Sequence, residues 1–244
     1  MHCRAATKLL HEMTTFRLGQ SQSSNEQLLV MIEDIEAHFA NERSFELEVM
    51  LGGALYAYVF NCVRGDARRT FLERIVRHWE RALELAHGSV ADWDVLPPWR
   101  NGPPEVYVRA ILGWFLVREA PVRDLDKALE HLEQVRCATS TYVPELCGYA
   151  DALYKRGDYL GCAKMAVELQ ARVASDPEWQ DMCPPALSRL LAQAYRAEAK
   201  RRHKQRDFCG AAEMYEKLVD TGAATSNDLR LRDRLVRHPD VGVR

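Results

Sequence analysis

The chain has 244 residues, of which 47% are hydrophobic, and its 33 Lys and Arg residues nearly balance its 35 Asp and Glu residues, for a net charge of −2. A chain of this length can bury a full core as one or two domains. The near balance of charge argues against a dedicated nucleic-acid binder and against a polybasic membrane protein. The seven cysteines include no CxxC pair, which argues against a zinc knuckle and fits the unpaired thiols of a cytoplasmic protein.

Strong helix formers dominate the periodic segments, and no sustained alternation of apolar and polar residues indicates a strand. We expect about eleven helices, near residues 3–17, 26–40, 44–63, 67–87, 104–119, 124–137, 143–156, 158–174, 185–204, 207–221 and 227–236. Two polar or proline-rich breaks, at 87–104 and 175–185, interrupt this series.

Neither the first segment nor the longest uncharged run predicts a membrane protein. The first 20 residues hold no apolar run beyond Leu9-Leu10, so we expect no secretory signal in the sequence as given, and whether one was removed upstream stays open. The run from Val49 to Val63 is short of the about 20 residues that a membrane span needs. A helix of this kind, apolar on all sides, is expected to be buried among other helices.

One spacing recurs along the chain: a large residue, a small or apolar residue three positions later, and two further core residues at helical spacing. The copies are Leu72, Ile75, Trp79 and Ala82; Leu125, Ala128, Leu132 and Val135; Tyr159, Cys162, Ala166 and Leu169; and Phe208, Ala211, Tyr215 and Leu218. Tyr159 follows Leu125 by 34 residues, and the two longer offsets contain the two breaks. A 34-residue period of paired helices is typical of tetratricopeptide repeats.

The chain resembles the tetratricopeptide repeat (TPR) family, in degenerate form, over residues 45–221. The matching residues are Leu51-Gly52 with Leu55, Leu112-Gly113 with Leu116, Gly157 with Tyr159 and Cys162, and Asp207-Phe208 with Ala211 and Tyr215. The resemblance implies an all-α, right-handed solenoid of antiparallel helix pairs. We expect an N-terminal helix and linker at 1–24, the TPR-like domain at 25–222, and a C-terminal capping helix and tail at 223–244. Within the motif, Gly157 ends one helix and Asp158 caps the next.

The geometry of this family implies which residues face the concave groove that the first helices form. They are Gly53, Tyr56, Trp114, Val117, Arg118, Asp151, Tyr154 and Lys155. Tyr107, at the entry of its helix, is a further candidate. Aromatic and cationic side chains together suit a short peptide or a small organic anion. The Lys and Asn set with which chaperone-binding members hold a C-terminal carboxylate is not recognisable.

The proline-rich break at 87–104 holds Trp93 and Trp99, one on each side of Pro97-Pro98. Tryptophan is favoured at interfaces. These two residues either fold the loop onto the solenoid or form a further partner-binding surface.

The sequence shows no pattern that carries catalysis, a cofactor or a metal. No HExxH, GxSxG or readable Ser-His-Asp arrangement occurs. Glu33, Glu36 and His38 share a helix face that could hold a metal, but an ordinary histidine is the favoured interpretation. The run KRRHKQR at 200–206 is either a phosphate-binding or nuclear-import patch or, as we favour, the cationic end of a helix. We expect no enzyme, no cofactor and no metal.

Two functions stay open. The first is a cytoplasmic, non-enzymatic interaction scaffold or adaptor that binds a protein or peptide segment, acidic if it meets Arg118 and Lys155. The second is a helical organic-anion-binding protein, because residues 105–203 more weakly resemble the T component of TRAP-type transporters. An open, polar groove favours the peptide, and a closed, aromatic one favours the small molecule. No nucleic-acid partner and no membrane span are expected, and homo-oligomer formation stays open.

Overall fold

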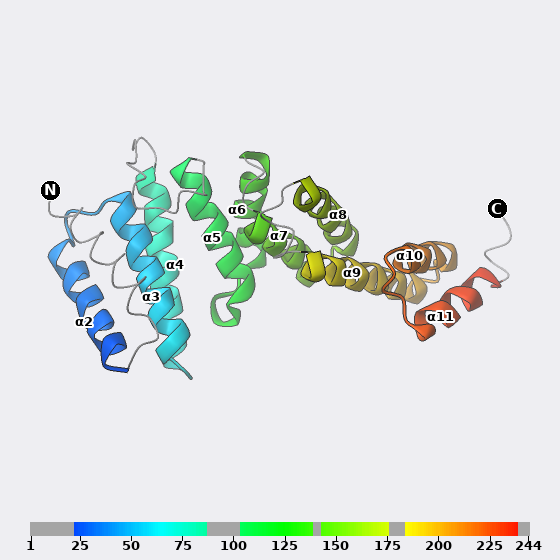
Figure 1. Cartoon of the computed structure of the whole chain (residues 1–244), viewed down its shortest axis with the longest axis horizontal. Coiled ribbons are helices and arrows are strands. Elements are labelled where there is room, and N and C mark those ends of the chain that lie inside the picture. The colour runs from blue at the N-terminus through cyan, green and yellow to red at the C-terminus, as the bar shows by residue number, and fades with distance from the viewer. Residues whose placement is uncertain (1–21, 87–102, 139–142, 176–183, 239–244) are drawn as a thin grey trace. The chain divides into compact units, whose positions relative to one another are not determined.

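A computed structural model describes residues 22–86, 103–138, 143–175 and 184–238 of the chain (Figure 1). Within these ranges the chain forms ten α-helices, one 3₁₀ helix and no strand. The elements are α2 (Gln22–His38), α3 (Phe45–Cys62), α4 (Ala67–Ala86), α5 (Pro104–Arg118), η2 (Ala120–Val122), α6 (Leu125–Ala138), α7 (Val143–Arg156), α8 (Tyr159–Ser175), α9 (Pro184–Lys204), α10 (Phe208–Asp220) and α11 (Ser226–Val236).

The expected all-α fold is confirmed, and each of these α-helices overlaps a helix expected from the sequence. The remaining expected helix, at 3–17, and the candidates Trp93 and Trp99 lie outside the described residues. Among the helices that the structure describes, none combines the length and the apolar character that crossing a membrane requires.

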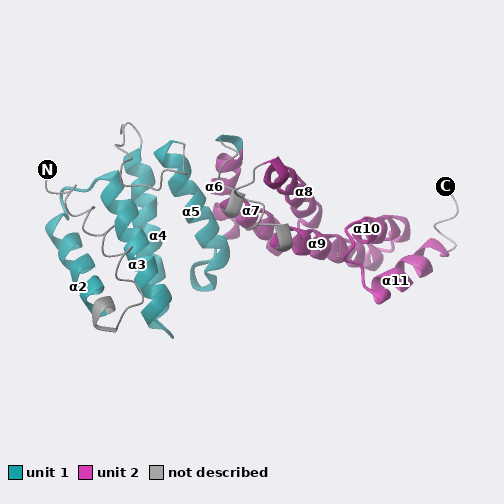
Figure 2. Ribbon diagram, viewed as in Figure 1, with its two compact units in different colours: residues 1–124, 137–141 teal, residues 125–136, 142–244 magenta. Residues whose placement is uncertain are grey.

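The helices divide into two compact units (Figure 2). Unit 1 comprises residues 1–124 and 137–141, and unit 2 comprises residues 125–136 and 142–244. In unit 1, α3 packs against α2 and α4, and α4 packs against α5. In unit 2, α7 to α11 each pack against the next helix along the chain. Packing between chain neighbours is the expected arrangement of a helical repeat; the domain boundaries at 24 and 222 stay a prediction.

The uncharged run in α3 is buried as expected. Leu51, Leu55 and Val59 are fully buried, and Gly52 lies directly beneath the indole ring of Trp79 from α4. A side chain at Gly52 would collide with that ring, so the glycine permits the close approach of α3 and α4. The Leu-Gly pair of the repeat motif is therefore explained by helix packing.

The connection between α7 and α8 follows the predicted chemistry. Gly157 adopts the left-handed region with φ 88°, and the amides of Gly157 and Asp158 donate to the carbonyls of Tyr154 and Leu153. The Asp158 carboxylate then accepts from the Gly161 amide at 2.9 Å. This Schellman ending followed by an N-cap stops one helix and starts the next within two residues.

The recurring positions of the sequence pattern form the cores of both units. The fully buried residues among them are Leu72, Ile75, Ala82, Ala128, Leu132, Val135, Cys162, Ala166, Leu169, Ala211 and Leu218. The first position of three copies, at Leu125, Tyr159 and Phe208, is only partly buried, because it opens its helix at the turn. The prediction that Cys162 and Ala211 are buried is confirmed.

Candidate functional site

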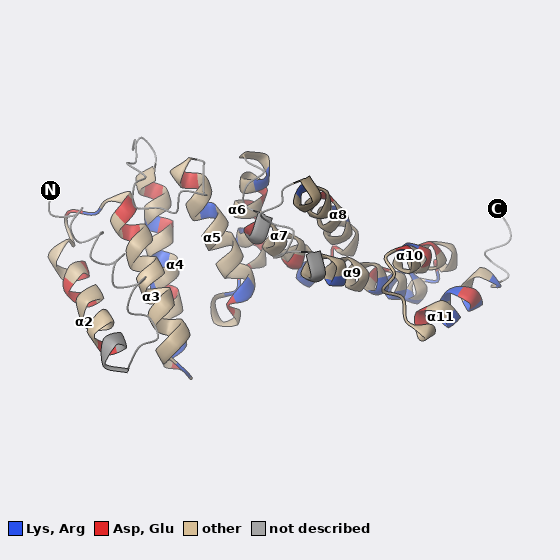
Figure 3. Ribbon diagram, viewed as in Figure 1, with Lys and Arg blue, Asp and Glu red and all other residues tan. Residues whose placement is uncertain are grey.

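A pocket of about 430 Å³ lies in unit 2, and we call it the tyrosine–lysine pocket. Its lining residues are Tyr154 from α7, Tyr159 from α8, and Gln193, Arg196, Ala197, Lys200, Arg201 and Lys204 from α9. The α9 residues recur at intervals of three and four, so they share one face of the helix. Basic residues gather along the C-terminal part of α9 in Figure 3.

The two tyrosines form the aromatic part of this pocket. The ring centroids of Tyr154 and Tyr159 lie 5.4 Å apart with the planes inclined at 59°, so each ring packs against the other across the turn between α7 and α8. Both residues are partly buried and keep surface toward the pocket. In one lining with the cations of α9, the tyrosine pair offers apolar ring faces and hydroxyl groups.

Two of the four cations in the pocket are held by carboxylates outside its lining. Arg196 donates to Asp228 through Nη2 at 2.9 Å and through Nε at 3.1 Å. Burial would raise the pKa of Asp228, but hydrogen bonds from Arg196 and Thr225 outweigh burial and lower that pKa to about 2. Arg201 donates to the buried Glu198 at 2.7 Å. These guanidinium groups are already largely neutralised.

Lys200 and Lys204 differ from the two arginines. Both are exposed, and neither lies within ion-pair distance of a carboxylate among the residues that the structure describes. No acidic side chain belongs to the pocket lining. The pocket therefore presents two unneutralised ammonium groups beside two tyrosines, an arrangement that attracts carboxylates.

Only one of the groove residues predicted in this part of the chain lies in the pocket, and that residue is Tyr154. Asp151 and Lys155 form an ion pair of 2.7 Å one turn apart on α7. Sequence reasoning missed Tyr159 and the α9 residues as site residues. The basic run at 200–206 was a signal for Lys200, Arg201 and Lys204 alone. Its favoured interpretation as a helix end is correct, since α9 ends at Lys204.

In unit 1 the structure brings three predicted residues together. The rings of Tyr56 and Trp114 meet edge to face at 6.4 Å, and the Arg118 guanidinium lies over the Trp114 ring at 4.9 Å. Phe60 extends this aromatic–cation cluster and is 58% exposed. The interpretation of Val117 as a groove residue is wrong: Val117 is buried, because it belongs to the core face of α5.

The other predicted residues of unit 1 add little to this cluster. Gly53 is exposed with open space above it, and Tyr107 is partly buried on α5. The prediction that the candidates from both units line one groove stays a prediction.

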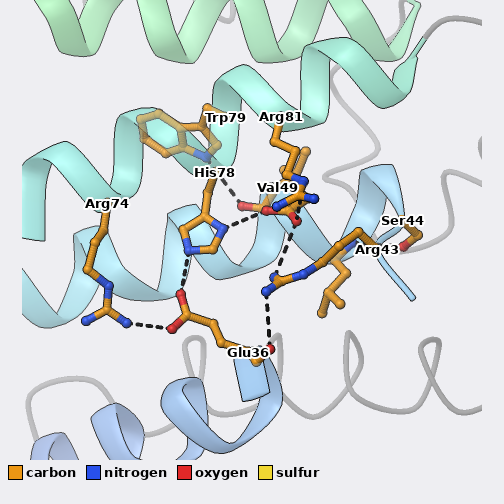
Figure 4. Close-up of polar contacts among 10 residues, drawn as sticks. Glu36, Arg43, Ser44, Val49, Arg74, His78, Trp79 and Arg81 are labelled. Atoms are coloured by element: carbon orange, nitrogen blue, oxygen red, sulfur yellow. Dashed lines mark hydrogen bonds and ion pairs between the residues drawn. The ribbon is translucent and has the colours of Figure 1, made fainter. Parts of the chain in front are cut away.

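A second polar region of unit 1 is a buried cluster around His78 (Figure 4). The two ring nitrogens of His78 each lie 2.6 Å from a carboxylate oxygen, Nδ1 from Glu48 on α3 and Nε2 from Glu36 on α2. Arg74 donates to Glu36 at 2.7 Å, and Arg43 lies 3.3 Å from Glu48. The cluster thus links α2, α3 and α4.

The protonation of this cluster follows from its contacts. Burial would lower the pKa of His78, but its hydrogen bonds to Glu36 and Glu48 outweigh burial and raise that pKa. Burial would likewise raise the pKa of Glu36, but His78 and Arg74 lower it. Only the imidazolium form can donate to two carboxylates at once, so His78 is held as a cation between two anions.

The metal interpretation of the α2 face does not hold. Glu36 is engaged by His78 and Arg74, while His38 is exposed and packs against the ring of Phe39. Within the described ranges no group of three or more His, Cys, Asp or Glu residues is arranged to hold a metal ion.

Comparison with known proteins identifies the fold. No family model matches the chain, and no curated protein matches it either. The chain is similar to the crystal structure of a protein described as a Podosopora anserina kinesin light chain with nearly identical TPR-like repeats. The TM-score is 0.51 and the sequence identity 18%, and the match covers 91% of this chain and 95% of that chain. The likeness establishes the fold: the chain is an all-α, TPR-like helical repeat.

Proposed function

We propose that this protein is a non-enzymatic interaction scaffold that captures an acidic segment of a partner protein in the tyrosine–lysine pocket. The observation that carries the proposal is the pair Lys200 and Lys204, which stand unneutralised beside Tyr154 and Tyr159. The TPR-like fold supports the same conclusion, because stacked helical repeats build extended surfaces that bind other proteins.

The physical basis is charge-assisted hydrogen bonding. A carboxylate that accepts from a lysine ammonium gains about 1.5–3 kcal/mol where the contact excludes water. The tyrosine rings supply apolar contact area at low cost in side-chain entropy, which favours them at interfaces. Together these groups bind a segment that combines acidic with apolar side chains.

The exposure of the pocket favours a peptide over an enclosed small molecule. Gln193, Lys200, Arg201 and Lys204 are all exposed, so a ligand here keeps one side in water. A drug-sized ligand site normally buries most of its occupant. Of the two functions that the sequence left open, the scaffold is therefore the better supported.

Unit 1 supplies a second proposed contact for the partner. Arg118 is exposed over Trp114 and lies within ion-pair distance of no carboxylate in the described part of the chain. A cation stacked on an aromatic ring keeps its donors free for a carboxylate while the ring packs on apolar groups. Tyr56, Trp114 and Arg118 therefore form a second proposed binding surface, confined to unit 1.

The cysteines support a reducing, cytoplasmic location. Cys62, Cys162 and Cys209 are free thiols, and disulfides are the usual state of paired cysteines in oxidising compartments.

The experiment measures binding of a fluorescein-labelled, glutamate-rich peptide by fluorescence anisotropy. The double variant Lys200→Ala, Lys204→Ala is expected to weaken binding at least tenfold, with a smaller loss at high salt. Lys164→Ala is the matched control, because Lys164 is an exposed lysine of α8 outside the pocket. Unchanged affinity in the double variant refutes the proposal. Displacement of the peptide by equimolar citrate favours the organic-anion function instead.

A further inference from the structure

The two free lysines of the tyrosine–lysine pocket are spaced by the α-helix that carries them. Lys200 and Lys204 are four residues apart on α9, so they lie on one face and are separated by about 6 Å along the helix axis. Arg196 continues the same row one turn earlier, but Asp228 already occupies its guanidinium group. The row therefore offers two adjacent positions for carboxylates, about 6 Å apart.

An extended peptide repeats at nearly the same distance. Its residues rise about 3.3–3.4 Å each, so side chains at positions i and i+2 point to one side about 6.7 Å apart. The side chain between them points to the opposite side. The pocket lining offers partners for both sides of such a segment: the lysines of α9 for one side and the rings of Tyr154 and Tyr159 for the other.

A helical partner is bulkier than an extended one at this pocket. An α-helix with its side chains is about 10–12 Å across, and it needs more than one turn to present acids at positions i and i+4. An extended segment presents two acids and the apolar side chain between them within three residues. The extended segment therefore brings both kinds of side chain to the pocket with less bulk.

We infer that the tyrosine–lysine pocket takes an extended segment of the pattern acidic–apolar–acidic. The two acidic side chains pair with Lys200 and Lys204, and the apolar side chain between them packs on Tyr154 and Tyr159. The inference rests on the proposed function and adds to it the conformation and spacing of the partner.

The test compares three fluorescein-labelled peptides of equal length and net charge by anisotropy. The first carries Glu-Leu-Glu, the second Leu-Glu-Glu, and the third places the two glutamates four residues apart in an alanine-rich helical sequence. The alternating peptide is expected to bind at least fivefold more tightly than either of the others. Tyr159→Ala is expected to remove most of that preference, because the central leucine loses its contact.

A double-mutant cycle tests the pairing directly. Each glutamate of the alternating peptide is replaced in turn by glutamine. After one replacement, only one of the two single variants, Lys200→Ala or Lys204→Ala, is expected to weaken binding further, because the other lysine has already lost its partner. The other glutamate should show the opposite dependence. Lys164→Ala is again the control.

The outcomes separate this inference from the proposed function. If the three peptides bind equally and all lose affinity in the lysine double variant, the spacing is wrong and the proposed function stands. Tighter binding of the helical peptide overturns the extended conformation. If none of the peptides binds, the inference and the proposed function both fail.

Discussion

The buried cluster around His78 in unit 1 and the tyrosine–lysine pocket in unit 2 use charged residues in opposite ways. In the cluster, the carboxylate of Glu48 is 1% exposed, and cations lie close to both Glu36 and Glu48. In the pocket, Lys200 and Lys204 stand in solvent without a carboxylate partner among the described residues. Buried, paired charges act on stability and on the choice of packing, whereas free, exposed charges act on binding.

Removal of Glu48 tests the unit 1 side of this comparison and has the largest expected effect. His78 and Arg43 both contact the buried carboxylate of Glu48, so Glu48→Ala removes the anion that they share. Breaking a buried ion pair in this way is expected to lower the free energy of unfolding by about 3–5 kcal/mol. Urea denaturation followed by circular dichroism measures the free energy of unfolding. Glu84→Ala, an exposed glutamate of α4, is the control and should change it by less than about 0.5 kcal/mol. A loss below about 1 kcal/mol for Glu48→Ala contradicts a structural role for the cluster.

The second prediction concerns pH and the same cluster. Because the pKa of His78 is raised in the folded state, its contribution to stability is complete below about pH 6.5, the ordinary pKa of histidine, and is lost as pH rises through the raised value. Because the pKa of Glu36 is lowered, its contribution is complete above its ordinary pKa near 4.5 and is lost as pH falls through the lowered value. The cluster therefore stabilises unit 1 most between about pH 4.5 and pH 6.5.

Hydrogen exchange of α2, measured by mass spectrometry from about pH 5.5 to about pH 8.5 and corrected for the intrinsic rate, checks this dependence. Protection of α2 is expected to fall as pH rises, and His78→Gln should remove most of the dependence. Protection that rises with pH in the parent protein contradicts the assignment of His78 as an imidazolium. The exposed His203 of α9 supplies the control variant His203→Gln, which should keep the parent's pH dependence.

Arg118 provides a third test, because it is an exposed cation without an ion-pair partner among the described residues, in the same unit as the paired cluster around His78. Arg118→Ala is expected to leave the free energy of unfolding within about 0.5 kcal/mol of the parent and to weaken capture of an acidic partner about tenfold. Anisotropy of the fluorescein-labelled, glutamate-rich peptide measures the binding, and urea denaturation of the same preparations measures the free energy of unfolding. Arg69→Ala, which removes an exposed cation paired with Glu73, should change neither. Binding unchanged in Arg118→Ala removes the unit 1 surface from the proposed function.

The fold could be predicted from the sequence because its signals are local. Gly157, Asp158 and the small residue Cys162 each act within one turn or one helix contact, and the structure bears out all three. Spacing alone cannot identify an ion pair between residues distant in sequence. The contact between Glu36 and His78, which lie 42 positions apart, was therefore missed. For the same reason the run at 200–206 predicted a helix end but not the tyrosines that complete the pocket.

Arg206 gives the last and smallest test, since it belongs to the basic run of unit 2 but not to the pocket lining. It adopts φ 61° and occupies the position at the end of α9 that Gly157 occupies at the end of α7. The hydrogen bonds correspond: the amides of Arg206 and Asp207 donate to the carbonyls of His203 and Arg202. A left-handed conformation costs about 1–2 kcal/mol for a residue with a side chain, and glycine avoids that cost but loses about 0.5–1 kcal/mol of chain entropy.

Arg206→Gly is therefore expected to raise the free energy of unfolding by up to about 1 kcal/mol, while Arg206→Ala, which removes the same charge but keeps the strained backbone, should not raise it. Urea denaturation separates the two variants. Neither should weaken the acidic peptide by more than about twofold, because the pocket's affinity comes from Lys200 and Lys204 and not from the net charge of the run. If both variants weaken binding as strongly as Lys200→Ala, the run acts as a diffuse basic patch, and the distinction between free pocket cations and the remaining surface charge of unit 2 is lost.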